Sequence, residues 1–218
     1  MSVPPPGTGY FVAPANGPGP AVLVIPSPWG LTTSLKQRAD ELAEAGFSVL
    51  VPDLNDGTVA SDEAEADRTL VEMDMNVAAS LVQSSLRLLR SAAADPSDPI
   101  GVLGFAAGAS WALWLAERLA DDVAAVVGFY GTQSLTFRDT RAAFLLHFGA
   151  HDTVVTDDEV ALLGLNLQMA GADFRIERHD HAGHGFAEAE RPTFNGKVEA
   201  ISWRQSLDFL AEHLRKRR

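Results

Sequence analysis

Two kinds of hydrophobic pattern alternate along the chain. Short, nearly continuous apolar runs recur, and between them lie longer segments whose apolar residues return every three or four positions. The runs predict buried strands, and the periodic segments predict helices. Their alternation is typical of a mostly parallel sheet with helices on both faces, because parallel neighbours need a crossover connection. We therefore expect an α/β fold in which residues 1–218 form one domain.

The pattern also gives approximate bounds for each element. Strands are predicted at 9–15, 21–26, 48–53, 100–105, 123–131, 142–149 and 173–180. Helices are predicted at 35–47, 69–94, 109–120, 157–172 and 197–218. The acidic segment 53–67 is expected to be a surface loop and the start of the next helix, since Asp and Glu favour helix N-termini.

Charge and cysteine content narrow the classes of function. Asp and Glu number 29 against 17 Lys and Arg, a formal net charge of −12. This balance argues against a nucleic-acid partner, because phosphate contacts need clustered basic side chains. The chain has no cysteine, which excludes disulfides, thiolate metal sites and a thiol nucleophile. Without a signal-peptide pattern or an apolar run of roughly 20 residues, we expect a soluble, cytoplasmic protein that does not bind membranes.

The segment GFAAGAS, residues 104–110, follows the strand predicted at 100–105 and precedes a helix. Its glycines have the spacing of a nucleophile elbow, G-x-nucleophile-x-G, a sharp strand-to-helix turn that lifts one side chain above a sheet. Ala106 occupies the nucleophile position and has no nucleophilic atom. Glycines at such turns often serve packing alone, so the motif gains weight only from its partners.

Those partners follow the ends of later strands, where ligands and catalytic groups gather in a doubly wound sheet. Asp152 comes after the strand predicted at 142–149, and His184 lies in the loop after the last one. An elbow followed by Asp and then His is the chain order of the triad in α/β hydrolases. Ala107 can still offer a backbone N–H to an oxyanion.

These motifs together resemble the dienelactone hydrolase family of α/β hydrolases over nearly the whole chain. The segments that carry the resemblance, in order, are VLVIPSPWGLT, VPDLNDGTVAS, GVLGFAAGASWALWL, HFGAHDTVV, AGHGFAEAERPTF and AISWRQSLDFLAEHL. The resemblance implies hydrolysis of small esters or lactones, without a cofactor, by a triad formed by position 106, Asp152 and His184.

The sequence departs from the family pattern at two positions. Members of the family carry Cys or Ser where this chain has Ala106. Pro28 falls near the first expected oxyanion donor, and proline has no N–H to give. Loss of a triad member leaves roughly 10³–10⁴-fold catalysis over water, and loss of one oxyanion donor costs on the order of 10²–10³ more. We therefore expect a very poor esterase.

Three hypotheses account for Ala106. The chain could be an inactivated variant of a Ser enzyme, because a single replacement would restore an ordinary GFSAG elbow. It could be a natural pseudoenzyme that keeps the pocket for binding. It could also be a non-covalent isomerase, cyclase or dehydratase, in which His184, oriented by Asp152, acts as a general base.

Other residues near the strand ends are candidates for the pocket. Ser27 and Trp29, beside Pro28, and His151, beside Asp152, are predicted to contact substrate. The cluster HDHAGH at 179–184 superficially suggests zinc, but no comparable group stands elsewhere to complete the ligands, so no metal site is predicted. Arg68 and Arg87 are expected on solvated helix faces rather than on a substrate carboxylate. The oligomeric state stays open.

Overall fold

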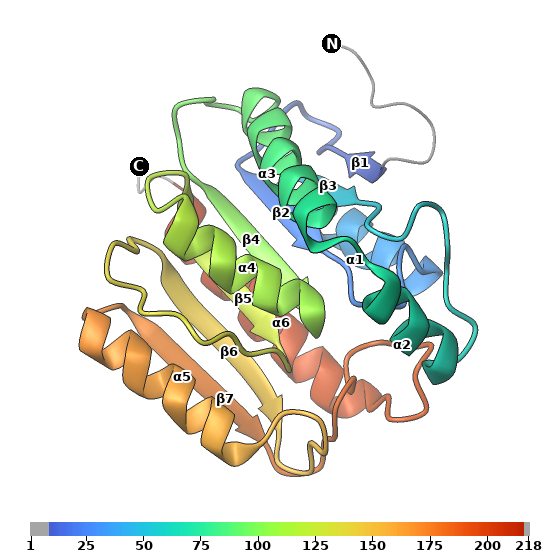
Figure 1. Cartoon of the computed structure of the whole chain (residues 1–218). Helices are drawn as coiled ribbons and strands as arrows, with labels where there is room; N and C mark the ends of the chain where they lie inside the picture. The colour runs from blue at the N-terminus through green and yellow to red at the C-terminus, as the bar shows by residue number, and fades with distance from the viewer. Residues whose placement is uncertain (1–8, 216–218) are drawn as a thin grey trace.

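The computed structural model describes residues 9–215, in which seven strands form one sheet with helices on both faces (Figure 1). The strands are β1 (Gly9–Val12), β2 (Ala21–Ile25), β3 (Ser48–Pro52), β4 (Ile100–Phe105), β5 (Val123–Phe129), β6 (Ala143–Gly149) and β7 (Phe174–His179). Every predicted strand is present, which confirms the α/β class. Residues 1–8 and 216–218, the ends of the predicted domain and of its last helix, lie outside the described residues.

The strand order is β1-β3-β2-β4-β5-β6-β7. Only β1 runs antiparallel to its neighbour, β3, and all other pairs are parallel. The chain moves from β2 outward to β3 and then returns to the other side of β2 to form β4. This reversal opens a crevice at the carboxyl ends of β2 and β4, which is where doubly wound sheets bind ligands. The loop after β2 and the elbow after β4 both lie at this place.

The helices are α1 (Thr33–Glu44), α2 (Glu63–Glu72), α3 (Met75–Ser91), α4 (Ala107–Arg118), α5 (Asp157–Ala170) and α6 (Gly196–Leu214). One hydrophobic cluster joins α3, α4 and α5 to one face of the sheet, and a second joins α1 and α6 to the other (Figure 1). The central strands β2, β3, β4 and β6 are buried along their whole length. Their continuous apolar runs follow from this double cover.

The single helix predicted at 69–94 is wrong, because two helices, α2 and α3, occupy this region. The chain leaves helical geometry at Met73, where ψ is 124°. The Asp74 carboxylate then accepts hydrogen bonds from the N–H groups of Asn76 and Val77, at 2.9 and 3.2 Å. An Asp that caps the following helix competes with helix continuation, and the apolar periodicity on either side does not reveal it.

His147, on β6, forms a buried polar group beneath the carboxyl end of the sheet. The Ser206 hydroxyl donates to the carbonyl of Ser202 at 2.7 Å, so it accepts from His147 Nε2 at 3.2 Å. Nδ1 of His147 then accepts from Nε2 of His179, at 3.2 Å. Burial, reinforced by the charges of His179 and Arg175, lowers the pKa of His147 to about 3. The folded protein therefore holds this imidazole neutral.

This buried histidine predicts acid sensitivity. In the unfolded chain His147 takes up a proton below about pH 6.5, whereas the folded state resists it until about pH 3. The unfolded state thus binds more protons between these values, and the free energy of unfolding falls as the pH falls, by up to about 1.4 kcal/mol per pH unit. Chemical denaturation between pH 7 and 4 should show that the free energy of unfolding of His147→Gln depends less steeply on pH than that of the parent chain. The exposed His151→Gln is the control, and equal slopes for all three proteins would contradict the prediction.

Candidate active site

The turn between β4 and α4 has the geometry of an elbow. Ala106 adopts φ 50° and ψ −119°, a region that a residue with a Cβ seldom enters. The chain is forced into it by close packing, because a Cβ on Gly104 would lie 2.2 Å from the carbonyl oxygen of Gly108. A Cβ on Gly108 would lie 2.3 Å from the carbonyl oxygen of Ile25, on β2. Strand and helix therefore meet more closely than side chains would permit, and the side chain of Ala106 is raised into a pocket.

Asp152 and His184 form a hydrogen-bonded pair at this pocket. One carboxylate oxygen of Asp152 lies 3.0 Å from Nδ1 of His184. The other accepts from the N–H groups of Val154 and Val155, at 2.8 and 2.9 Å, so the carboxylate is fixed at both ends.

Electrostatics keep this carboxylate charged. Burial by itself would raise the pKa of Asp152, but the hydrogen bonds from His184 and from the backbone outweigh it and hold the pKa below its ordinary value. An ionised Asp152 accepts the proton on His184 Nδ1, which leaves Nε2 as the basic nitrogen. This is the tautomer that a general base requires.

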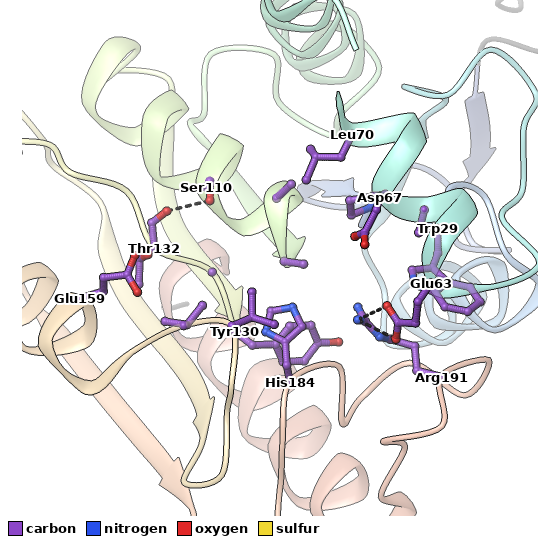
Figure 2. A pocket seen from close by; sticks show the side chains of 17 residues that line it. Trp29, Glu63, Asp67, Leu70, Ser110, Tyr130, Thr132, Glu159, His184 and Arg191 are labelled. Carbon is purple, nitrogen blue, oxygen red and sulfur yellow. Dashed lines mark hydrogen bonds and ion pairs between the residues drawn. The ribbon is translucent and has the colours of Figure 1, made fainter. Parts of the chain in front are cut away.

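The pocket encloses about 430 Å³ and is bounded by the loops after β2 and β5, the elbow and helix α2 (Figure 2). Ala106, Ala107 and His184 lie on its wall, and Trp29, Tyr130 and Leu70 supply apolar surface. Figure 2 shows Glu63, Asp67 and Leu70 of α2 across the cavity from His184. The volume suits a small organic molecule.

The residues proposed for an oxyanion hole also lie on the pocket wall. Ala107 is the first residue of α4, where a backbone N–H has no carbonyl one turn earlier in the helix. Pro28 lines the pocket without an N–H, and its carbonyl accepts from the side chain of Asn55 at 2.8 Å. The next N–H, of Trp29, donates to the Ser27 hydroxyl at 3.2 Å. In the loop after β2, the Pro28 carbonyl and the Trp29 N–H are therefore already engaged in hydrogen bonds within the protein.

The residues that were predicted to contact substrate lie in different places in the structure. Trp29 lines the pocket, whereas Ser27 is buried behind the wall. The structure does not bring His151 to the pocket, because its side chain is exposed and is not among the lining residues; its backbone N–H donates to the carbonyl of Ala182 at 3.0 Å. Among residues 9–215, no group of three or more His, Asp or Glu side chains is arranged to hold a metal ion.

Sequence reasoning missed Glu188, four residues after His184. Its carboxylate, on a side chain that is 13% exposed, accepts from the hydroxyls of Ser27 and Tyr130, the latter at 2.9 Å, and lies 3.4 Å from Nη1 of Arg191. Burial raises the pKa of Glu188, opposed by Arg191 and by the two hydroxyl donors. The segment around it is polar and rich in turns, which indicates an exposed loop, so the sequence held no signal of this burial.

A nearly parallel sheet with an elbow after a central strand, followed by an acid and a histidine on later loops, is the arrangement of α/β hydrolases. The chain belongs to the dienelactone hydrolase family, whose profile matches residues 8–214.

Three known proteins show the extent of the similarity. The chain is 26% identical over 216 residues to protein usf of Aquifex pyrophilus, covering 94% of this chain and 93% of that protein. It is 24% identical over 217 residues to carboxymethylenebutenolidase 1 of Cupriavidus pinatubonensis, covering 93% and 90%. The crystal structure of a dienelactone hydrolase-like promiscuous phosphotriesterase from metagenomic libraries superposes with a TM-score of 0.83 at 25% identity, covering 95% and 92%. In the part of this chain that the structure describes, no helix is both long and apolar enough to cross a membrane.

The backbone of Ala106 predicts an unusual response to glycine. Replacing alanine by glycine ordinarily costs about 0.5–1 kcal/mol in chain entropy, in addition to the lost methyl contacts. At position 106 the change also relieves a strain of about 1–3 kcal/mol, because glycine tolerates positive φ. Ala106→Gly should therefore destabilise less, by at least about 1 kcal/mol, than Ala107→Gly in the first turn of α4. Urea unfolding of both variants tests this, and equal losses would show that the elbow is unstrained.

Proposed function

We propose that the pocket is built to hydrolyse small esters or lactones through a triad of residue 106, Asp152 and His184, and that Ala106 leaves this chain nearly inactive by that route. The observation that carries the proposal is the strained backbone of Ala106 beside an intact Asp152–His184 pair. Such strain persists only where the surrounding structure imposes it, and it clusters at active sites. Family membership and the name of the carboxymethylenebutenolidase relative support a lactone or ester bond as the bond that is cleaved; they do not specify the charge of the substrate of this chain.

The geometry assigns a role to each group once a hydroxyl stands at position 106. His184 Nε2 takes the hydroxyl proton as the oxygen attacks the substrate carbonyl, and Asp152 stabilises the resulting imidazolium. In this proposal the N–H of Ala107, which lines the pocket, donates to the developing oxyanion. His184 then returns the proton to the leaving oxygen, and water repeats the sequence to release the acid. Ala106 stops the first step because its methyl group can form no acyl bond.

A non-covalent reaction is the second candidate. The same pair that would activate a hydroxyl can remove a proton from water or from a carbon acid, and it is complete without a nucleophile. Pro28 favours this alternative, since a hole with fewer N–H donors gives less stabilisation to a tetrahedral oxyanion. A pseudoenzyme that only binds its ligand would use the pocket without using the basicity of His184.

Restoring the hydroxyl tests the hydrolase proposal. We expect Ala106→Ser to raise kcat/KM for p-nitrophenyl acetate by at least about 10³-fold over the parent chain, because loss of a triad residue costs on the order of 10⁴–10⁶-fold in kcat. In the Ala106→Ser background, His184→Ala should abolish the gain. Release of p-nitrophenolate measures both effects.

Ala107→Ser is the matched control. It places a hydroxyl one residue later, on the ordinary helical backbone of α4, and should give no gain. An Ala106→Ser protein that stays inert toward a panel of small esters and lactones would overturn the hydrolase proposal. Proton exchange or isomerisation that depends on His184 in the unaltered chain would instead support the non-covalent reaction.

A further inference from the structure

The charge balance of the pocket bears on which substrates it accepts. Apart from His184, Arg191 is the only basic side chain among the described residues that line it. Nη2 of Arg191 lies 3.2 and 3.1 Å from the two carboxylate oxygens of Glu63, and Nη1 lies 3.4 Å from Glu188. The guanidinium charge is therefore already compensated by two carboxylates.

Packing also holds Arg191 in place. Its side chain is only 9% exposed. The guanidinium lies over the ring of Trp29, 5.8 Å from the ring centre. A Cβ on Gly185 would lie 2.3 Å from Nε of Arg191, so the side chain is pressed against the backbone next to His184. If the Arg191 side chain moved out to bind a substrate anion, it would lose both its ion pairs and this packing. One new ion pair would offset only part of that loss.

The rest of the charged wall is acidic. Glu63 and Asp67 project from α2 on one side of the cavity and Glu159 lies on the other (Figure 2). Hydrogen bonds from Thr156 lower the pKa of Glu159, which keeps it ionised. Because Glu63 is paired with Arg191, the two other lining carboxylates, Asp67 and Glu159, leave the wall with a net negative charge, on a chain whose formal net charge is −12. An anion entering this pocket would lose water and meet like charges.

We propose that the pocket excludes substrates that carry a carboxylate and selects esters or lactones that are neutral or bear a positive charge. This inference rests on the proposed function, because it specifies the substrate class of the same site. The inferred charge preference concerns the same pocket that His184, the partner of Asp152, lines. The acidic residues act there by making the electrostatic potential at the bound molecule negative.

Three aryl acetates that differ mainly in charge provide the test. They are 4-acetoxybenzoate, its methyl ester, and 4-(trimethylammonio)phenyl acetate. Hydrolysis by the Ala106→Ser protein is measured as kcat/KM, and each value is divided by the rate of that ester with hydroxide, which corrects for intrinsic reactivity. We expect the corrected value for the carboxylate to be at least tenfold below that of its neutral methyl ester, with the cationic ester equal to the neutral one or faster. Added salt should narrow the differences.

Two substitutions on α2 test whether the acidic residues of this pocket cause the charge preference. Glu63→Gln, at a half-exposed side chain, removes a partner of Arg191. It should reduce the ratio of corrected kcat/KM between the methyl ester and the carboxylate, here called the gap, by about threefold to tenfold. Glu72→Gln removes the same charge from the end of the same helix, outside this pocket, and should leave the gap unchanged. A carboxylate ester hydrolysed as fast as the methyl ester, or an equal response to both variants, would overturn the inference.

Binding to the unaltered chain separates this inference from the proposed function. If Ala106→Ser hydrolyses none of the three esters, the proposed function fails on its own. Calorimetric titration of the Ala106 chain with 4-acetoxybenzoate and its methyl ester then decides the charge preference. Binding of the methyl ester at least tenfold tighter supports the preference, whereas equal affinities, or no binding of the methyl ester, contradict it.

Discussion

The site depends on the close approach of three backbone segments at the carboxyl end of β4. Gly104 and Gly108 let α4 begin directly against β4 and β2, and Gly131 packs so near that a Cβ there would lie 2.3 Å from the carbonyl oxygen of Ala106. Buried strands on both sides hold these contacts in place. Any larger residue would push the helix away and let position 106 relax. The core packing sustains the strain at Ala106, so the shape of the turn does not depend on the side chain at position 106.

A largely buried carboxylate connects the loops around this elbow. Glu188 receives hydroxyl donors from Ser27, after β2, and from Tyr130, after β5, while its own loop follows β7. Burying an acid is costly unless its oxygens are satisfied, so the three loops are stabilised only in the arrangement that brings these donors together. His184 lies four residues earlier in the same loop. The position of His184 is therefore tied to the rim of the pocket as well as to Asp152.

The parts of this structure that follow from local chemistry were predictable from the sequence. Continuous apolar runs located all seven strands, and glycine spacing located the sharp turn between β4 and α4. The hydrogen-bonded pair of Asp152 and His184 agrees with the expectation from chain order, although their catalytic role stays a prediction. Glu188 was missed because its contacts come from loops distant in sequence, and His151, predicted to contact substrate, is exposed and does not line the pocket. Such tertiary contacts do not alter the hydrophobic periodicity of the sequence, so periodicity cannot predict them.

The same loop explains why the pocket has basic residues but no available positive charge. Residues 184–191 bring a histidine, a buried acid and a guanidinium into one short segment, and Glu188 lies close enough to Arg191 to neutralise it before any ligand enters. Helix α2 adds Glu63 from the opposite wall. Nε of Arg191 already has no hydrogen-bond partner, and removing either carboxylate would leave one more part of the guanidinium unpaired, so the ion pairs that hold the loop also set the sign of the potential. Stability of the histidine loop and selection against anions are in this way two consequences of one set of contacts.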